Sequence, residues 1–212
     1  NANMIYAAIG TIDAWKDAGF EVPGPDAEAD WDTGAIIGTG IGGIDTISET
    51  LGPRVDAGKV RRLGSTMVEQ VMSSGNSARI AGLLALGNQV STNSSACNTG
   101  TEAVVMGAQR IRDGLATRML AGGSEGHSHY IWAGFDAMKV LNRTKNDDPA
   151  AASRPMSASA AGFIPGSGAG VLMLEELESA QGRGARIYAE VLGGALNCGG
   201  HRQGGSMTAP NP

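Results

Sequence analysis

Apolar residues recur at helical spacing near the start of the chain, at Met4, Ile5, Ala8, Ile9, Ile12 and Trp15. This period predicts an amphipathic helix over residues 3–18, which ends at Gly19. Later apolar segments predict strands at 33–38, 88–93, 117–121, 168–174 and 186–193, and helices at 66–73, 76–86, 99–113 and 175–182, with helical character also running up to residue 50. The alternation of strands and helices predicts an α/β layer fold.

Two polar stretches interrupt this pattern. Residues 54–65 are predicted to form a surface loop of basic character. Residues 143–161 are polar and contain proline, so they are predicted to form an excursion from the layers. No internal repeat or low-complexity segment is present, which argues against a repeat architecture.

Composition narrows the class of protein. The chain has 212 residues, of which 42% are hydrophobic, enough for one sizeable core. Only 17% are charged and 33 are glycine, which indicates a tightly packed, loop-rich α/β protein of the kind that often buries surface in an oligomer. The formal net charge of −5 gives no sign of nucleic-acid binding.

Cysteine usage and hydropathy bear on location. Cys97 and Cys198 are far apart and form no disulfide framework, so a reducing, cytoplasmic setting is expected. The longest apolar candidate, residues 80–86, falls well short of the roughly 18 residues that a membrane span needs, so no membrane association is expected. No signal peptide is visible. The start at Asn1 and the end at residues 208–212 are expected to be cuts within a longer protein.

Cys97 stands between the strand predicted at 88–93 and the helix predicted at 99–113. A side chain at such a turn stands clear of the sheet, and the helix N-terminus favours the reactive thiolate. Backbone N–H groups of the turn can bind the oxyanion of a tetrahedral intermediate. The placement fits a nucleophile and a buried core thiol equally well. Small neighbours that would let a substrate approach are Ser94, Ser95, Ala96 and Gly100.

The segment SSACNTG at residues 94–100 resembles the active-site signature of the elongating β-ketoacyl-acyl-carrier-protein synthases, especially the bacterial type I and type II enzymes. Further blocks follow in the order of that family: GTGIGG at 38–43, AGGSE at 121–125, GFDAM at 134–138, ASRP at 152–155, GF at 162–163, GSGAG at 166–170, LEE at 174–176, AQGRG at 180–184, IYAE at 187–190 and MTAP at 207–210. The resemblance covers essentially the whole chain.

The resemblance implies a thiolase-like α/β fold, in which two similar halves stack in αβαβα layers and residues 1–212 are the N-terminal domain. It implies an acyltransferase of fatty-acid or polyketide synthesis that performs a decarboxylating Claisen condensation. The acyl chain moves from an acyl-carrier protein to a cysteine, and a malonyl-carrier protein then loses CO₂ and attacks it. The implied partners are that carrier protein and a second ketosynthase subunit, in a homodimer or heterodimer. No cofactor is implied beyond the phosphopantetheine arm of the carrier.

The resemblance also implies roles for single residues. Cys97 takes the nucleophile position, and its own N–H is expected to be one oxyanion donor. Ile41 matches the position that lines or gates the acyl tunnel, Phe135 an aromatic beside the cysteine, and Thr208 a threonine near the phosphopantetheine arm. Phe135 is equally compatible with core packing, and Thr208 with a surface loop. Met72 is a weaker candidate for an apolar wall at the dimer interface.

A basic cluster formed by Lys59, Arg61 and Arg62 admits two interpretations. The family binds its carrier protein beside this region, so the cluster is a candidate docking patch for an acidic carrier, whose encounter it would steer. The alternative is a solvated surface without a partner.

Two departures from the family pattern stand out. An acidic residue of the family, just before the Gly-Phe pair, is replaced by Ala161. The two histidines with which the family decarboxylates belong to its C-terminal half, and His127, His129 and His201 do not lie in matching contexts. The chain alone is therefore expected to have an incomplete site. An inactive fragment and a non-catalytic ketosynthase-like subunit stay open as alternatives, although such subunits characteristically lack the cysteine.

Three other candidate sites are weak. His127 and His129 lack the neighbouring ligands of a metal site, so no metal is expected. Cys198 and His201 could form a dyad, but they lie in a glycine-rich loop without family support. The glycines of residues 38–43 are spaced too closely for a dinucleotide fingerprint.

Overall fold

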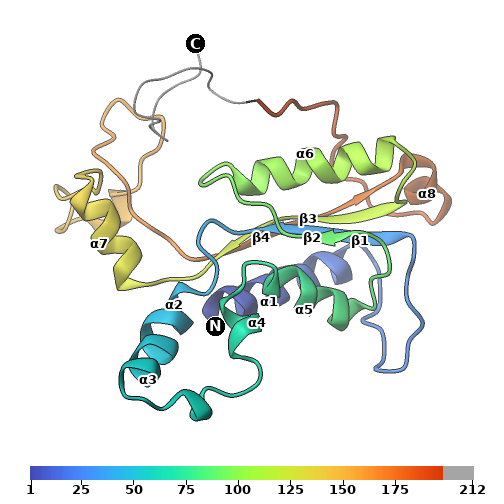
Figure 1. Cartoon of the computed structure of the whole chain (residues 1–212). Helices are drawn as coiled ribbons and strands as arrows, with labels where there is room; N and C mark the ends of the chain where they lie inside the picture. Colours follow the sequence, from blue (N-terminus) through green and yellow to red (C-terminus); the bar gives the residue numbers. More distant parts are fainter. Residues whose placement is uncertain (198–212) are drawn as a thin grey trace.

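A four-stranded mixed sheet lies at the centre of the molecule (Figure 1). The computed structural model describes residues 1–197. Its strands are β1 (Thr33–Gly38), β2 (Val90–Ser91), β3 (Arg118–Glu125) and β4 (Gly168–Glu175), in the order β2-β1-β3-β4. β1 pairs in parallel with β2 and β3, whereas β4 runs antiparallel to β3. The three parallel strands therefore end at one edge of the sheet, where open α/β sheets bind their ligands.

Helices cover both faces of this sheet. α1 (Ala2–Asp17) and α5 (Gly75–Leu84) lie on one face, and α6 (Thr99–Arg112) lies on the other (Figure 1). The shorter helical segments are α2 (Ile44–Thr46), a π-helical turn (Ile47–Leu51), α3 (Gly52–Asp56), a 3-10 turn (Val60–Arg62), α4 (Met67–Val71), α7 (His129–Ala137), a second 3-10 turn (Pro149–Ala151) and α8 (Leu177–Gly182). These layers confirm the α/β fold class predicted from the sequence.

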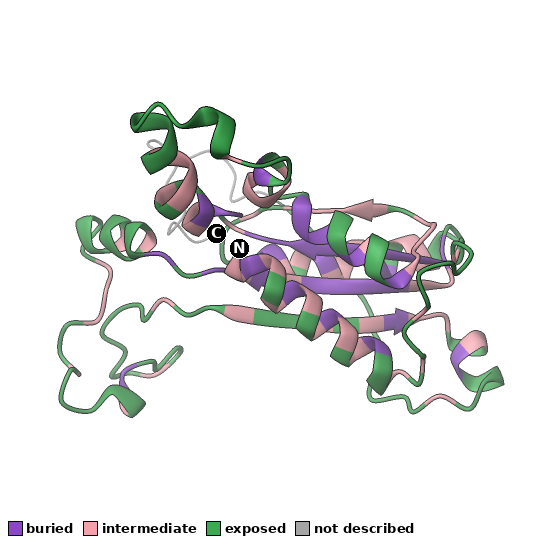
Figure 2. Ribbon diagram, turned by 90° about the horizontal axis from the view of Figure 1, so that it is seen from below, coloured by how far each residue is buried: buried purple, intermediate pink, exposed green. Residues whose placement is uncertain are grey.

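The core is divided by the sheet into two clusters, because successive strand side chains point to opposite faces. Ile37 and Leu120 pack with Trp15, Ile80 and Leu84 on the side of α1 and α5. The other cluster, beneath α6, contains Ile36, Ala103, Ala108, Ala116, Met119, Ala121 and Leu174. Figure 2 shows the buried residues gathered where the sheet meets these helices.

α1 matches the predicted helix to within one residue at each end. Asn1 caps its start by accepting a hydrogen bond from the N–H of Met4. Ala7, Thr11 and Trp15 recur every fourth residue and are all buried, as expected for one face of a helix. This face fixes α1 across β3 and β4.

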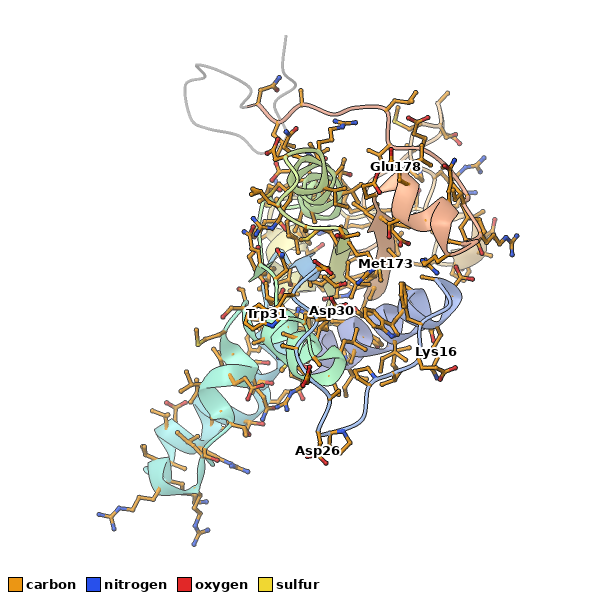
Figure 3. The ribbon with its side chains drawn as sticks, turned by 90° about the vertical axis from the view of Figure 1, so that its right-hand side faces the viewer. Lys16, Asp26, Asp30, Trp31, Met173 and Glu178 are labelled. Carbon is orange, nitrogen blue, oxygen red and sulfur yellow. The ribbon has the colours of Figure 1, made fainter. Side chains whose placement is uncertain are left out.

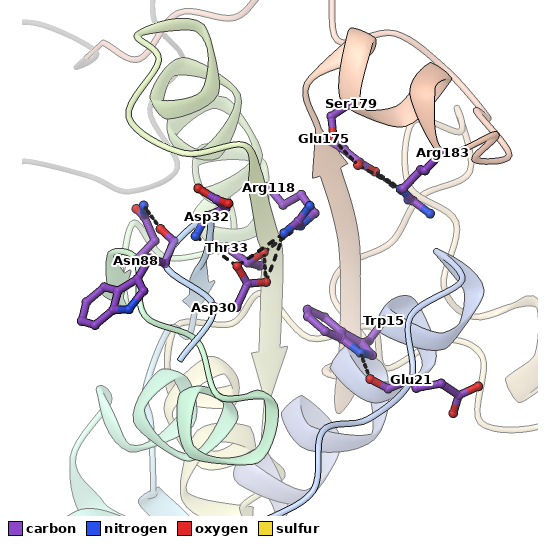
Figure 4. Close-up of polar contacts among 11 residues, drawn as sticks. Trp15, Glu21, Asp30, Asp32, Thr33, Asn88, Arg118, Glu175, Ser179 and Arg183 are labelled. Atoms are coloured by element: carbon purple, nitrogen blue, oxygen red, sulfur yellow. Dashed lines mark hydrogen bonds and ion pairs between the residues drawn. The ribbon is translucent and has the colours of Figure 1, made fainter. Parts of the chain in front are cut away.

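An ion-pair cluster closes the sheet at the amino ends of its parallel strands (Figure 4). The Arg118 guanidinium donates to the hydroxyl of Thr33 at 2.8 Å and contacts the Asp30 carboxylate at 3.2 Å. Thr33 itself donates to Asp30 at 2.6 Å. Partial burial opposes ionisation of Asp30, but the Thr33 hydroxyl, the Arg118 charge and the Asp32 N–H outweigh it, so the pKa of Asp30 is lowered.

A second pair lies beside the first on β4 and α8. Arg183 contacts Glu175 at 2.6 Å, and Ser179 donates to the same carboxylate at 2.8 Å. Burial again opposes ionisation, but these donors and the charge of Arg183 lower the pKa of Glu175. The guanidinium of Arg183 also lies 4.4 Å from the ring centre of Phe20, which joins this end of the sheet to the segment after α1.

Residues 44–72 project from the body of the molecule (Figures 1 and 3). The sequence predicts a loop at 54–65, and the structure instead places the end of α3 and a 3-10 turn within this range. Most side chains of α3 and of this 3-10 turn are exposed, so no long apolar period marks these elements in the sequence.

The strand predicted at 186–193 is wrong. These residues pair with no strand among residues 1–197, although their backbone is held by Arg112, which donates to the carbonyl of Val191 at 2.7 Å. An apolar run forms a strand only where a neighbour supplies ladder hydrogen bonds, and Ile187 and Leu192 are left exposed instead.

Two strands have bounds that differ from the predicted ones by several residues, and one helix was missed. The strand predicted at 88–93 is paired only at Val90–Ser91, β3 runs on to Glu125, and α7 was not predicted. Within residues 1–197, no helix combines the length and the apolar character of a membrane span.

Candidate active site

Cys97 lies in the turn between β2 and α6, at the edge of the sheet where the parallel strands end. α6 begins two residues later, with Asn98 as its N-cap residue. The thiol is free and exposed. A buried core thiol, which the sequence left open, therefore does not describe this residue. The predicted strand-to-helix turn is present and offers its cysteine to solvent.

Thr99 holds this turn together with its side chain. Its hydroxyl donates to the carbonyl of Ala96 at 2.6 Å and accepts from the N–H of Ser95 at 2.8 Å. Its own carbonyl accepts from the Asn93 side chain at 2.9 Å. Ala96 has a positive φ of 54°, a conformation that costs a non-glycine residue about 1–3 kcal/mol and persists only where its surroundings enforce it. The Thr99 bonds supply that enforcement on both sides of Ala96.

The end of β1 packs directly on this turn. A Cβ atom at Gly38 would lie 2.1 Å from the Thr99 methyl group and 2.5 Å from the Asn93 side-chain oxygen, so only glycine fits there. The N–H of Thr39 donates to the carbonyl of Asn93 at 3.2 Å, and the Ser94 hydroxyl donates to the carbonyl of Gly40 at 3.4 Å. The glycine-rich loop and the cysteine turn thus form one unit.

Ile41 and Phe135 both lie in segments that leave this edge of the sheet. Ile41 follows β1, is 46% exposed, and donates its N–H to Glu125 at 3.3 Å. Phe135 is half-buried on α7, with its ring centre 5.6 Å from that of Phe163 in an edge-on contact. Thr208 lies outside the described residues.

The glycine of the Gly-Phe pair that carries Phe163 is required by the backbone. Gly162 has a φ of +125°, and a Cβ atom there would lie 2.5 Å from the carbonyl oxygen of Val140. The neighbouring residue, Ala161, is exposed. The position at which the resemblance implies an acidic residue is therefore an exposed alanine.

The basic cluster lies on the projecting segment and is exposed to solvent. Lys59 precedes the 3-10 turn that contains Arg61 and Arg62, and the Arg54 side chain donates to the carbonyl of Arg62. An open groove of about 540 Å³ runs beside it, lined by Leu51, Val60, Arg61, Leu63, Gly64, Ser65, Met67, Val68, Val71 and Met72. The cluster thus borders an apolar surface that includes Met72, the weaker interface candidate.

The histidines form no site of their own in the described part of the chain. His127 and His129 are exposed, and His129 lies against the ring of Tyr130 at 4.2 Å between centres. No group of three or more His, Cys, Asp or Glu side chains within residues 1–197 is placed to hold a metal ion. Cys198 and His201 lie outside this range.

Glu125 is a site residue that sequence reasoning missed. It ends β3, and its carboxylate accepts from the N–H groups of Gly40 and Ile41. The sequence shows it only as the last letter of a family block, and its partners lie 84 and 85 residues away. No local spacing could have joined them.

Residues 4–180 match the family model described as beta-ketoacyl synthase, N-terminal domain. The chain belongs to the β-ketoacyl synthases. Among relatives, 3-oxoacyl-(acyl-carrier-protein) synthase I, chloroplastic, of Arabidopsis thaliana is 40% identical over 178 residues, which are 84% of this chain and 36% of the relative. For 3-oxoacyl-(acyl-carrier-protein) synthase 2 of Vibrio harveyi the identity is 38% over 212 residues, 97% of this chain and 48% of the relative. The β-ketoacyl synthase chain thus spans less than half the length of these relatives.

Solved structures agree with the family. The complex AntDE:AntF, described as a type II PKS acyl-carrier protein with its ketosynthase bound to the hexaketide, matches with a TM-score of 0.78 and 27% identity over 88% of this chain and 46% of that one. A β-ketoacyl synthase from Burkholderia phymatum matches with a TM-score of 0.77 and 32% identity over 88% of this chain and 45% of its own. The thiolase-like fold expected from the sequence is confirmed.

Proposed function

We propose that the protein containing this β-ketoacyl synthase chain performs a decarboxylating Claisen condensation with Cys97 as its acyl acceptor. The Cys97 thiolate attacks the thioester carbonyl of an acyl-carrier protein and releases the carrier thiol. A malonyl-carrier protein then loses CO₂, and the resulting carbanion attacks the acyl-cysteine carbonyl. The new carbon–carbon bond forms as the Cys97 thiolate leaves, which gives a 3-oxoacyl-carrier protein.

The observation that carries this proposal is the exposed Cys97 thiol just before α6. An exposed thiol at this edge of the sheet is accessible to an acyl thioester, and backbone N–H groups of the turn are the proposed donors to the oxyanion that forms on its attack. The Cys97 N–H is the expected first donor. A free, exposed thiol persists most readily in a reducing compartment, which supports the proposal of a cytoplasmic location.

The carrier protein is proposed to dock on Lys59, Arg61 and Arg62. Between residues 52 and 63, four cationic side chains stand against one carboxylate, and all are exposed. Opposed potentials steer a charged partner toward such a surface. The ketosynthase of the AntDE:AntF structure is itself described in complex with its acyl-carrier protein. The carrier would deliver its substrates on phosphopantetheine, with no further cofactor.

A two-subunit assembly, homodimer or ketosynthase heterodimer, is proposed through β2. Among residues 1–197, this strand is at the edge of the sheet and pairs on one side only, with β1. An edge strand with free backbone groups is a ready template for pairing with another chain.

The experiment compares the full-length parent with its Cys97→Ser and Cys198→Ser variants. Condensation of acyl- and malonyl-carrier protein should be lost in the first and kept in the second. Retained condensation by Cys97→Ser would overturn the proposal.

A further inference from the structure

Glu125 links the end of β3 to the loop that follows β1. One carboxylate oxygen accepts from the N–H of Gly40 at 2.8 Å. The other accepts from the N–H of Ile41 at 3.3 Å and from the Thr39 hydroxyl at 3.0 Å. All three partners are donors, so an ionised carboxylate satisfies them together and an amide cannot.

Two further hydrogen bonds to the Thr39 hydroxyl fix the direction of its bond to Glu125. The Thr39 hydroxyl accepts from the Asn3 side chain at 2.8 Å and from the N–H of Gly42 at 3.2 Å. With both acceptor positions used, its single proton can go only to Glu125. Thr39 is 2% exposed and Asn3 is fully buried, so water offers no substitute for the missing acceptor if Glu125 is replaced.

The loop that Glu125 holds also touches the cysteine turn. The carbonyl of Gly40 accepts from Ser94, and the N–H of Thr39 donates to the carbonyl of Asn93. Residues 39–41 are therefore held from two directions. Glu125 accepts hydrogen bonds from all three of these residues, and the segment just before Cys97 bonds the N–H of Thr39 and the carbonyl of Gly40. The position of Ile41 relative to Cys97 depends on both attachments.

We propose that Glu125 is a positioning residue that sets the acyl-chain length accepted at Cys97, by fixing the loop that carries Ile41. This inference rests on the proposed function and on the match of Ile41 to the family position that lines the acyl tunnel. If the hydrogen bonds of Glu125 to residues 39–41 are lost, the loop is no longer fixed against the cysteine turn. Selection among acyl chains should then weaken, while attack by Cys97 on a short acyl group needs no contact with Ile41.

The experiment measures kcat/KM for condensation by the full-length parent with acyl-carrier proteins of increasing chain length. Glu125→Gln should change the ratio of long-chain to short-chain kcat/KM by about tenfold, because a misplacement of an ångström at a site carries effects of this size or larger. The acylation rate of Cys97 with a short acyl group should fall less than kcat/KM for long chains, because only the longer chain is proposed to reach Ile41. Ile41→Phe, which adds volume to the same loop, should shift the profile toward short chains. Glu178→Gln on exposed α8 is the control and should leave the profile unchanged.

Thr39→Val and Thr39→Ser provide a test that does not depend on Glu125→Gln folding. Valine keeps the branched shape and removes the hydroxyl that donates to Glu125, so it should shift the profile in the same direction as Glu125→Gln. Serine keeps the hydroxyl and should restore the unmodified profile. A flat profile in the Glu125 and Thr39→Val variants, with Cys97 still acylated, would overturn this inference alone. Absence of Cys97 acylation in the unmodified parent would overturn the proposed function with it.

Discussion

Thr99 shows how much of the cysteine turn depends on one side chain. Its hydroxyl bonds the backbone on both sides of Ala96, whose positive φ is otherwise unfavourable for alanine. The sequence marks Cys97 by its place between a strand and a helix. It does not mark Thr99, because its partners are backbone atoms that any residue supplies.

Thr99→Val should destabilise the protein while preserving the shape of the side chain. The N–H of Ser95 loses the Thr99 hydroxyl, and the carbonyl of Ala96 keeps only the N–H of Thr99 as a donor. Each lost hydrogen bond costs about 0.5–1.5 kcal/mol. Thermal unfolding of the variant is compared with that of Thr101→Val, an exposed position on the same helix. Equal melting temperatures for the two variants would show that the Thr99 hydroxyl does not hold the turn.

Asp30 should make the free energy of unfolding depend on pH. Its folded pKa is lowered, so its contribution is present above the unfolded value of about 4 and is lost as the pH falls through the folded pKa. Asp30→Asn should therefore flatten the decrease in the free energy of unfolding below about pH 4. Denaturant unfolding between pH 7 and pH 2 measures this. Asp26→Asn, in the loop after α1, is the control, and an equally steep decrease in both variants would contradict the assignment.

At the scale of elements, periodicity predicted most of the layers. α1, β1, α5 and α6 were found within a few residues of their predicted bounds, because each of the three helices buries one regular face and β1 is buried on both faces. α7 escaped prediction, since none of its residues is fully buried. The segment 186–193 was wrongly predicted as a strand. Its residues are apolar enough for a strand, but no strand lies beside them in the described part of the chain.

The residues of the candidate site also differ in whether the sequence could reveal them. Cys97 could be found from the sequence, since strand, small residues and helix follow one another there. Glu125 could not, because its partners follow a different strand and meet it only when β1 and β3 pair. Sites built by parallel strands collect residues that are distant in sequence, so local patterns show their parts and not their contacts.

The projecting segment 44–72 carries a prediction of its own. Arg61→Glu combined with Arg62→Glu should slow association with an acidic carrier protein and reduce its salt dependence, because the steering potential is reversed. Condensation rates with small acyl thioesters should stay unchanged. Lys16→Glu on α1 is the control charge reversal. An equal loss of activity with small thioesters would mean that the arginines serve structure and not docking.

At the scale of the whole molecule, the chain spans less than half of its relatives. Decarboxylation builds negative charge on the malonyl thioester oxygen, and losing one positioned donor typically costs about 10²–10³ in rate. The family resemblance places those donors on two histidines outside this chain. His127 and His129 are exposed and have no carboxylate or metal partner within residues 1–197 that would position them.

The purified 212-residue chain should therefore not catalyse condensation, whereas the full-length parent should. Exposed apolar residues such as Ile187 and Leu192 should also make the chain alone prone to association. Turnover assays of both proteins, with light scattering of the shorter one, measure these outcomes. Robust turnover by the 212-residue chain would show that its own histidines complete the site.

The most direct test of the account is to trap the acyl group on the full-length parent. The parent is incubated with an acyl-carrier protein in the absence of a malonyl donor, so that the acyl-enzyme accumulates. Peptide mass spectrometry should then find the added acyl mass on the peptide that contains Cys97, and prior iodoacetamide treatment should abolish it. Acylation at Cys198, or no acylation at either cysteine, would contradict the assignment of Cys97 as the acyl acceptor.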